Sequence, residues 1–258
     1  PLRRHRPRRP RLPLRIVSRQ PVIGILEAGR PPEALAAIHG DYPSFVRRWL
    51  APLGARFVTH AVMDGDVPAA PAHADLWVVT GSRFGVYEDH GWIAPAEAFI
   101  RACAGGGARM FGMCFGHQLI ARAMGGVVRK SEKGWGLGVH DYAVSEWPHG
   151  GQPAKLSLQA FHQDQVEVAP PGARVIASSA FCPAAALWYP GFALSVQGHP
   201  EFTASYARAL IELRRGVTLG DRDADRGVRT VMRPTDGEAL ACLVKDLLLG
   251  KLGSGMAV

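Results

Sequence analysis

The sequence predicts an α/β fold in three layers, with helices on both faces of a mostly parallel central sheet. Up to residue 125, short apolar runs typical of buried strands alternate with amphipathic runs that follow the helical period. The connections between these runs are short, which favours parallel strands joined by crossover helices. From residue 127 the chain changes to short strand-like runs broken by Gly, Pro and Asp. This change predicts a small antiparallel sheet appended to the central one.

In the first half of the chain, each expected element follows from a local pattern. Residues 42–53 form an amphipathic run that ends at Gly54, and residues 93–104 form a second helical run before three consecutive glycines. Residues 117–124 predict a third helix, closed by a pair of glycines. The β-rich apolar runs between these helices predict four strands, at residues 22–26, 56–62, 76–80 and 108–113.

In the second half, short strand-like runs come first and helices follow. The strand-like runs lie at residues 127–144, 156–168, 174–178, 184–189 and 192–196. Residues 203–215 predict a helix, the polar stretch 216–236 a surface loop, and residues 237–249 a closing helix. We therefore expect one domain over residues 21–250, followed by a short tail at residues 251–258.

Length and composition indicate a globular protein of a reducing compartment. The chain has 258 residues, of which 47% are hydrophobic and 20% charged, a balance that allows a full buried core. Its four cysteines form no C-x-x-C pair and have no metal-like spacing with histidine. We therefore expect a cytoplasmic protein without disulfides or a metal site. No apolar run approaches the roughly 20 residues that span a bilayer, so a membrane protein is not expected.

The net charge of +8 comes largely from the N-terminus, where eight arginines lie within the first twenty residues. Because repeated Pro and Arg cannot build a core, residues 1–20 are expected to form a disordered basic arm. An arm of this kind could instead contact phosphates of a nucleic acid or serve as a targeting peptide. The rest of the chain is nearly neutral and has no basic-aromatic pattern, so a nucleic-acid partner is not expected.

One cysteine lies between two glycines where an expected strand meets an expected helix. The run is Gly112-Met113-Cys114-Phe115-Gly116, which predicts a sharp turn with Cys114 at its centre. Such a turn exposes the middle side chain beyond the carboxyl edge of the sheet, and the N-terminus of the next helix favours a thiolate there. The pattern predicts a nucleophilic cysteine; the alternative is a buried structural one.

A histidine and a glutamate follow a later apolar run and are expected at the same sheet edge. They lie two residues apart in His199-Pro200-Glu201. Side chains at i and i+2 of an extended segment point the same way, and Pro200 disfavours a helix there. The Glu201 carboxylate can therefore bind one ring nitrogen and leave the other to face the thiol as a base. The alternative is a turn histidine beside a solvated glutamate.

Taken together, these two segments closely resemble the two signatures of class I (triad-type) glutamine amidotransferases, in the same order. They read GMCFGHQ at residues 112–118 and QGHPEF at residues 197–202. Further matches are TGS at residues 80–82, KGWGLG at 133–138 and FHQDQ at 161–165. The resemblance covers roughly residues 22–215 and implies a flavodoxin-like three-layer sandwich that uses no cofactor and no metal.

The resemblance also implies a role for each matching residue. Cys114 would attack the γ-carboxamide carbon of glutamine. His199, oriented by Glu201, would protonate the departing ammonia and then activate water to cleave the thioester. Residues around the turn and in two neighbouring loops would bind the oxyanion and the substrate: Gly81, Ser82, Phe115, Gln118 and Gln163.

One loop departs from many relatives and indicates a branch of the family. Synthase-linked members carry Gly-Gly-Pro at the oxyanion loop, whereas residues 81–89 read GSRFGVYED. This version resembles stand-alone GMP-synthase-like amidotransferases and plant-type γ-glutamyl peptidases. We expect Arg83 to be an exposed surface residue, with contact to a substrate carboxylate as the alternative. His117 and His162 are expected to be structural neighbours of the pocket rather than bases.

The leading hypothesis is a glutaminase that passes ammonia to a separate synthase, because the remaining residues leave no room for an acceptor domain. The alternative is a stand-alone γ-glutamyl peptidase or hydrolase that acts on γ-glutamyl peptides or amines. Both use the same three residues, so the sequence does not choose between them. A degenerate fold kept as a binding module is a third hypothesis, and the intact Cys114, His199 and Glu201 argue against it.

Overall fold

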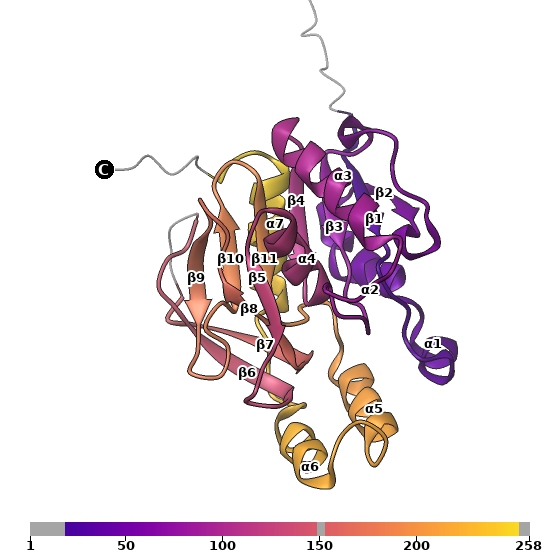
Figure 1. The fold of residues 1–258 in the computed structure, drawn as a ribbon, viewed down its shortest axis with the longest axis vertical. Coiled ribbons are helices and arrows are strands. Elements are labelled where there is room, and N and C mark those ends of the chain that lie inside the picture. The colour runs from indigo at the N-terminus through magenta and orange to yellow at the C-terminus, as the bar shows by residue number, and fades with distance from the viewer. Residues whose placement is uncertain (1–18, 149–152, 253–258) are drawn as a thin grey trace, which may run out of the picture.

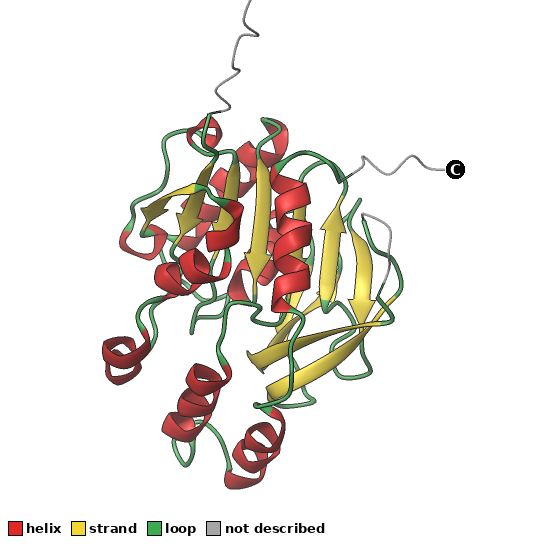
Figure 2. Cartoon of the chain, turned by 180° about the vertical axis from the view of Figure 1, so that it is seen from behind, coloured by secondary structure: helices red, strands yellow, loops and turns green. Residues whose placement is uncertain are grey.

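The computed structural model describes residues 19–148 and 153–252 and has the α/β architecture that the sequence predicts. A nine-stranded sheet runs in the order β2-β1-β3-β4-β11-β10-β9-β6-β7, and a separate two-stranded sheet pairs β5 with β8. Helices lie on both faces of the central sheet (Figure 1, Figure 2). The expected fold class is thereby confirmed. Most of the expected basic arm, residues 1–18, and residues 253–258 of the expected tail lie outside the described residues.

Five neighbouring strands of the central sheet are parallel and bring their carboxyl ends to one edge. Their side chains are almost all buried on both faces, as expected for a parallel sheet covered by helices. The pairings Val79 with Gly112 and Val196 with Met113 align the ends of three of them. The parallel strands are β1 (Val22–Leu26), β2 (Arg56–His60), β3 (Leu76–Val79), β4 (Arg109–Met113) and β11 (Ala193–Val196).

The antiparallel strands extend the central sheet beyond β11 and also form the small second sheet. Each of the expected runs 127–144 and 156–168 divides into two strands that belong to different sheets. The central sheet continues through β10 (Ala186–Tyr189), β9 (Arg174–Ser178), β6 (Gly136–Val144) and β7 (Lys155–His162). The second sheet consists of β5 (Val127–Lys130) and β8 (Asp164–Val168).

Two helices pack on each face of the parallel strands, and alternate strand residues supply the two cores. On one face, α2 (Tyr42–Trp49) and α7 (Gly237–Leu248) enclose strand side chains such as Phe111 and Val196. On the other face, α3 (Ile93–Gly105) and α4 (Phe115–Ala123) cover Trp77 and Met110. Short 3₁₀ turns lie at Ala51–Leu53, Val62–Asp64 and Pro71–His73.

Three further helices lie at the lower end of the molecule in Figure 1, beyond the carboxyl edge of the parallel strands. They are α1 (Glu33–His39), α5 (Ala204–Arg214) and α6 (Asp221–Thr230). A third apolar cluster joins them to the body of the protein through Phe45 of α2 and Leu137 of β6. We call α5, α6 and the residues between them the α5–α6 lobe. No helix of the described residues is long and apolar enough to cross a membrane.

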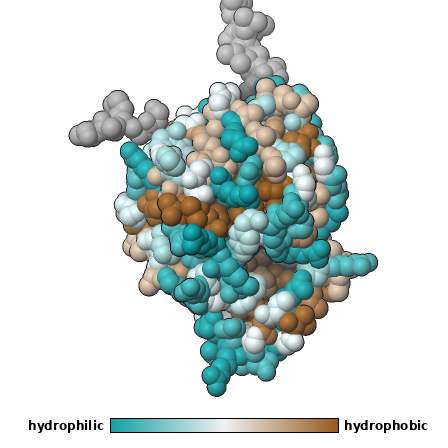
Figure 3. Space-filling view, viewed as in Figure 1, coloured by the Kyte–Doolittle hydropathy of each residue, from teal (hydrophilic) through white to brown (hydrophobic). Residues whose placement is uncertain are grey.

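The prediction of a surface loop over residues 216–236 is wrong, because α6 forms within it. The helix exposes a charged face, which Figure 3 shows as the hydrophilic lower end of the molecule, and this composition resembles that of a loop. Its stability comes from acidic residues in the first turn, a basic residue in the last turn, and buried small residues at Ala224 and Gly227. Leu219 and Val231, also buried, flank it on either side.

Glycines allow α6 to lie against β6 at very short range. Gly138 of β6 has a φ of +75°, and a methyl group there would overlap the Thr230 hydroxyl and the carbonyl oxygen of Gly227. A methyl group on Gly227 would in turn lie 2.7 Å from Cβ of Leu137. The α5–α6 lobe is therefore held closely against the central sheet.

We expect Gly138→Ala to lower the free energy of unfolding by about 2–4 kcal/mol, through backbone strain and overlap with α6. The matched control is Gly172→Ala, which also has a positive φ, +79°, but has no atom within 4 Å of an added methyl group. Strain alone should cost the control about 1 kcal/mol. Urea unfolding of both variants measures the difference, and equal losses would contradict the close contact between α6 and β6.

Candidate active site

Cys114 lies in the sharp turn between β4 and α4, as the sequence predicts. Its φ of 50° and ψ of −107° make it the one non-glycine residue with positive φ among the described residues. Its N–H donates to the carbonyl oxygen of Val196 at 2.9 Å, and its carbonyl accepts from the N–H of Gln118 at 3.1 Å. Hydrogen bonds to β11 and to α4 thus hold the strained backbone in place. Strain of this kind is typical of functional sites.

The glycines on either side of Cys114 are required by close contacts. A methyl group on Gly116 would overlap the carbonyl of Val79 at the end of β3. A methyl group on Gly112 would lie 2.7 Å from the carbonyl carbon of Gly116. Only residues without a side chain allow the turn to be this tight.

His199 and Glu201 follow β11 and form a buried ion pair. Nδ1 of His199 lies 2.7 Å from Oε1 of Glu201, and the two residues are 4% and 8% exposed. The N–H of His199 donates to the carbonyl oxygen of Gln159 on β7 at 2.8 Å. The imidazole also stacks on Phe202 with ring centroids 3.8 Å apart and an interplanar angle of 10°. These contacts fix the ring in one orientation.

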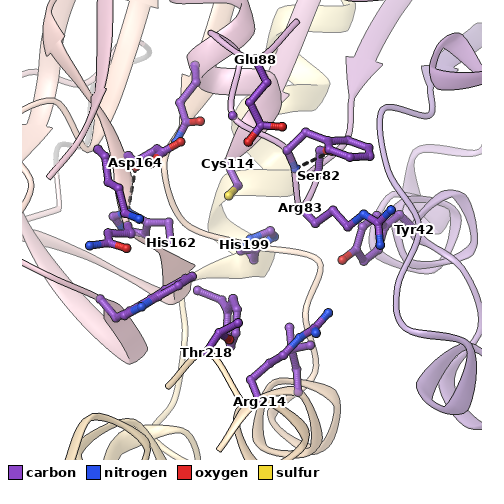
Figure 4. A pocket seen from close by; sticks show the side chains of 18 of the residues that line it. Tyr42, Ser82, Arg83, Glu88, Cys114, His162, Asp164, His199, Arg214 and Thr218 are labelled. Atoms are coloured by element: carbon purple, nitrogen blue, oxygen red, sulfur yellow. Dashed lines mark hydrogen bonds between the residues drawn. The ribbon is translucent and has the colours of Figure 1, made fainter. Parts of the chain in front are cut away.

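The charges around His199 favour its protonated form. Burial by itself lowers the pKa of His199, but the Glu201 and Cys114 charges and hydrogen bonds to both side chains raise it to about 10. Figure 4 shows the sulfur of Cys114 pointing toward the His199 ring. The imidazole therefore carries a proton at neutral pH, beside the thiol and within reach of a bound substrate.

Gly81, after β3, brings its backbone against both of these side chains. A methyl group there would lie 2.9 Å from Cε1 of His199 and 3.9 Å from Cβ of Cys114. Phe115 is the first residue of α4, a position whose N–H has no acceptor inside the helix. Both residues thus bring backbone to the place where an oxyanion would form on a Cys114 adduct.

Cys114 and His199 open into a cavity of about 410 Å³ between the body of the protein and the α5–α6 lobe (Figure 4). The cavity also contains Ser82, Gln118 and Gln163, which the sequence predicts as substrate-binding residues. Among the predicted residues, Gly81, Phe115 and Glu201 do not line the cavity. They lie beside or behind the residues that do.

Two predicted substrate-binding glutamines already have partners within the protein. Nε2 of Gln118 donates to the carbonyl oxygen of Asp164 at 2.8 Å and to Oε1 of Gln197 at 3.1 Å. Nε2 of Gln163 donates to the carbonyl oxygen of Ser131 at 3.5 Å. Gln118 is 2% exposed, so it links β8 to the turn at Cys114 and presents little surface to the cavity.

The other candidate side chains differ in their access to the cavity. His117 is fully buried, lies 2.8 Å from Oγ of Ser195 through Nδ1, and does not line the cavity. His162 lines it, and burial lowers its pKa to about 3, so its ring is neutral. Arg83 also lines the cavity, although it is exposed and its guanidinium lies 4.9 Å from the centre of the Phe84 ring.

Several cavity residues have no counterpart in the sequence-based prediction. They come from four separate regions, which only the tertiary structure brings together: Tyr42, Glu88, Trp135, Phe161, Asp164, Leu210, Arg214 and Thr218. The one signal in the sequence was the spacing of Leu210 and Arg214, which are four residues apart on an expected helix and so share a face. Nothing in the sequence indicates that this face meets the turn at Cys114.

Residues 71–213 match the family described as glutamine amidotransferase class-I. The match covers more than half of the chain, and the protein belongs to this family. Gamma-glutamyl peptidase 4 of Arabidopsis thaliana is 30% identical over 176 residues, which cover 64% of this chain and 69% of the relative. A subunit of the glutamine-hydrolyzing GMP synthase of Thermococcus kodakarensis is 36% identical over 100 residues, or 36% of this chain and 50% of the relative.

Solved structures agree with this fold. A glutamine amidotransferase from Thermotoga maritima superposes with a TM-score of 0.70 at 19% identity, over 90% of this chain and 97% of the other. A glutamine amido transferase from Methylobacillus flagellatus has the same TM-score at 20% identity, over 90% and 93% of the two chains. At these identities the likeness concerns the fold alone.

We expect Gly81→Ala to lower kcat/KM at least about 100-fold while the protein remains folded, because the methyl group would push His199 away from Cys114. The matched control is Gly91→Ala, since an added methyl group there has no atom within 4 Å. Steady-state kinetics and thermal unfolding of both variants provide the measurement. Full activity in Gly81→Ala would show that the His199 ring is not held against residue 81.

Burial lowers the pKa of His117 to about 3, below the value near 6.5 of an unfolded chain. Below pH 6.5 the unfolded chain therefore binds a proton that the folded protein excludes, and each further drop of one pH unit lowers stability by about 1.4 kcal/mol for this residue. In His117→Gln the decline in unfolding free energy between pH 6 and pH 4 should be shallower by that amount. His73→Gln, at an exposed site, should keep the wild-type slope. Urea unfolding at each pH tests this, and identical slopes in all three proteins would refute it.

Proposed function

We propose that the protein hydrolyses γ-glutamyl amide bonds through a cysteinyl thioester on Cys114. One observation carries the proposal: a strained, cavity-facing cysteine lies beside a protonated histidine that a buried carboxylate orients. Nucleophile, base and orienting group in this arrangement are what acyl transfer requires. Membership of the class-I glutamine amidotransferase family supports an amide as the substrate.

In the first half of the proposed reaction, the Cys114 thiolate attacks the γ-carbonyl carbon of the substrate. The resulting oxyanion accepts hydrogen bonds from the backbone of Phe115 and of the Gly81 loop. The carbon–nitrogen bond then breaks as the His199 imidazolium gives its proton to the departing nitrogen. A γ-glutamyl thioester and a neutral His199 remain.

In the second half, the neutral imidazole takes a proton from water, which attacks the thioester carbonyl at the same oxyanion position. The carbon–sulfur bond breaks, glutamate leaves, and the thiolate–imidazolium pair is restored. Glu201 keeps Nδ1 occupied in both halves, so the other ring nitrogen always serves as the acid and base. The buried pair with Glu201 also favours the imidazolium at each return to the starting state.

Two substrate classes fit this chemistry. With glutamine, the product is ammonia, which would pass to a separate synthase; the GMP synthase relative from Thermococcus supports this option. With γ-glutamyl peptides or amines, the product is a free amine and no synthase is needed; the Arabidopsis gamma-glutamyl peptidases support this option. The wide cavity beyond Cys114 favours the second class, because ammonia requires little room.

We expect Cys114→Ala to reduce the hydrolysis of glutamine and γ-glutamyl dipeptides at least about 1,000-fold, since no other group can form the thioester. Cys242→Ala removes an exposed free cysteine and should leave activity unchanged. Release of ammonia and of free amino acids measures both reactions. A glutamine-like diazoketone should label wild type at Cys114 alone. An active Cys114→Ala, or a wild type that turns over neither substrate and takes no label, would overturn the proposal.

We expect Glu201→Gln to lower kcat at least about 100-fold, because the imidazolium loses the charge that stabilises it. Without that carboxylate the pKa of His199 should fall. The matched control is Glu212→Gln, which removes an exposed carboxylate from the lobe. Wild-type kcat and an unchanged pH profile in Glu201→Gln would contradict the proposed role of this residue.

A further inference from the structure

The cavity has two chemically different halves on either side of the Cys114–His199 pair. One half contains the carboxylates of Glu88 and Asp164, which Figure 4 shows on the far side of Cys114 from the α5–α6 lobe. The other half lies below His199 in Figure 4 and is bounded by Arg214 and Thr218 of the lobe. Trp135, Phe161 and Leu210 complete this second half, which we call the lobe half.

The direction of proton transfer decides which half receives the leaving group. The departing nitrogen must face His199, because His199 supplies its proton. His199 lies between Cys114 and the lobe side chains in Figure 4. The part of the substrate attached to that nitrogen therefore extends into the lobe half. The γ-glutamyl part, with its ammonium group, then lies toward Glu88 and Asp164.

The lobe half combines an apolar wall with one cation. Trp135 and Phe161 pack with ring centroids 5.5 Å apart, and Leu210 is 5% exposed. Arg214 is half-buried and has no ion-pair partner among the described residues. Its neighbour Arg215, in contrast, binds Glu212 and Asp225, each at 2.8 Å. Figure 4 shows the Arg214 side chain rising from α5 into the cavity, so its guanidinium is free to bind an anion there.

The wall is built before any substrate arrives. Nη2 of Arg226 on α6 donates to the carbonyl oxygen of Trp135 at 3.0 Å, and this anchors the indole-bearing residue to the lobe. The close contact of Gly138 with Gly227 fixes α6 on β6 directly beyond it. A cavity of about 410 Å³ lies within the range of about 300–1,000 Å³ that is typical of sites for ligands larger than glutamine.

We propose that the lobe half is a leaving-group subsite, and that the substrates are γ-glutamyl amino acids with a large apolar side chain. The side chain would lie on Trp135, Phe161 and Leu210, and the free carboxylate would pair with Arg214. In the reaction the amide carbon–nitrogen bond breaks, a carbon–sulfur bond to Cys114 forms, and the amino acid leaves with the proton from His199. This inference rests on the proposed hydrolysis at Cys114.

The test compares γ-glutamyl-phenylalanine with γ-glutamyl-phenethylamide, which has the same ring but no carboxylate. Wild type should favour the first compound at least about 10-fold in kcat/KM. Arg214→Ala should lose about 10- to 100-fold on γ-glutamyl-phenylalanine and less than about 3-fold on the phenethylamide. The phenethylamide thus reports that the variant is folded. Arg214→Lys, which keeps the charge, should recover part of the loss.

Two further variants complete the experiment. Arg208→Ala removes an exposed arginine from the same helix and should leave both rates unchanged. Trp135→Ala should lower kcat/KM for γ-glutamyl-phenylalanine about 10-fold relative to γ-glutamyl-glycine, because only the first compound contacts the apolar wall. An equal effect on both compounds would place the side chain elsewhere and overturn this part of the inference.

The outcomes separate this inference from the proposed function. Turnover of glutamine without turnover of γ-glutamyl-phenylalanine would leave hydrolysis at Cys114 intact and overturn the subsite. Equal losses on all substrates in Arg214→Ala would place Arg214 on the γ-glutamyl part and also overturn it. Activity on none of the compounds, glutamine included, would overturn the proposed function and this inference with it.

Discussion

The backbone turn at Cys114 can exist only because neighbouring chain segments have no side chains in its way. Gly116 lies against the carbonyl of Val79, Gly112 against Gly116, and Gly81 against both His199 and Cys114. Each contact depends on the parallel pairing of β3, β4 and β11, which brings three carboxyl ends to the same level. The thiol and the imidazole therefore meet because the sheet aligns their strands, and any shift of register would separate them.

The α5–α6 lobe contributes to the site in two ways. Phe202 stacks on His199 and packs edge-to-face on Tyr206 of α5, with ring centroids 4.6 Å apart, so the lobe's apolar cluster also shields the buried ion pair. In such surroundings the attraction between imidazolium and carboxylate is strong, which favours the protonated ring. The same helix presents Arg214 to the cavity. Protonation of His199 and recognition of a leaving group thus depend on one packed unit.

Local patterns in the chain account for much of the fold and for the central residues of the site. Glycines around Cys114 indicate the turn, and Pro200 with the i, i+2 spacing brings Glu201 to His199, as found. Helix α6 escaped prediction because its outward residues are nearly all charged, and its few buried contacts acquire meaning only against β6. Hydrophobic periodicity cannot detect a helix whose buried side consists of alanine and glycine.

The amino-acid sequence by itself determines the order of strands and helices, the turn at Cys114 and the local pairing of His199 with Glu201. These features depend on neighbours along the chain, through backbone sterics, side-chain period and proline geometry. Only the tertiary structure decides the rest: which helix faces the thiol, which arginine of α5 enters the cavity, and which rings form its wall. Those contacts join residues far apart in the chain, and their geometry follows from sheet register and the packing of α5 and α6 on β6.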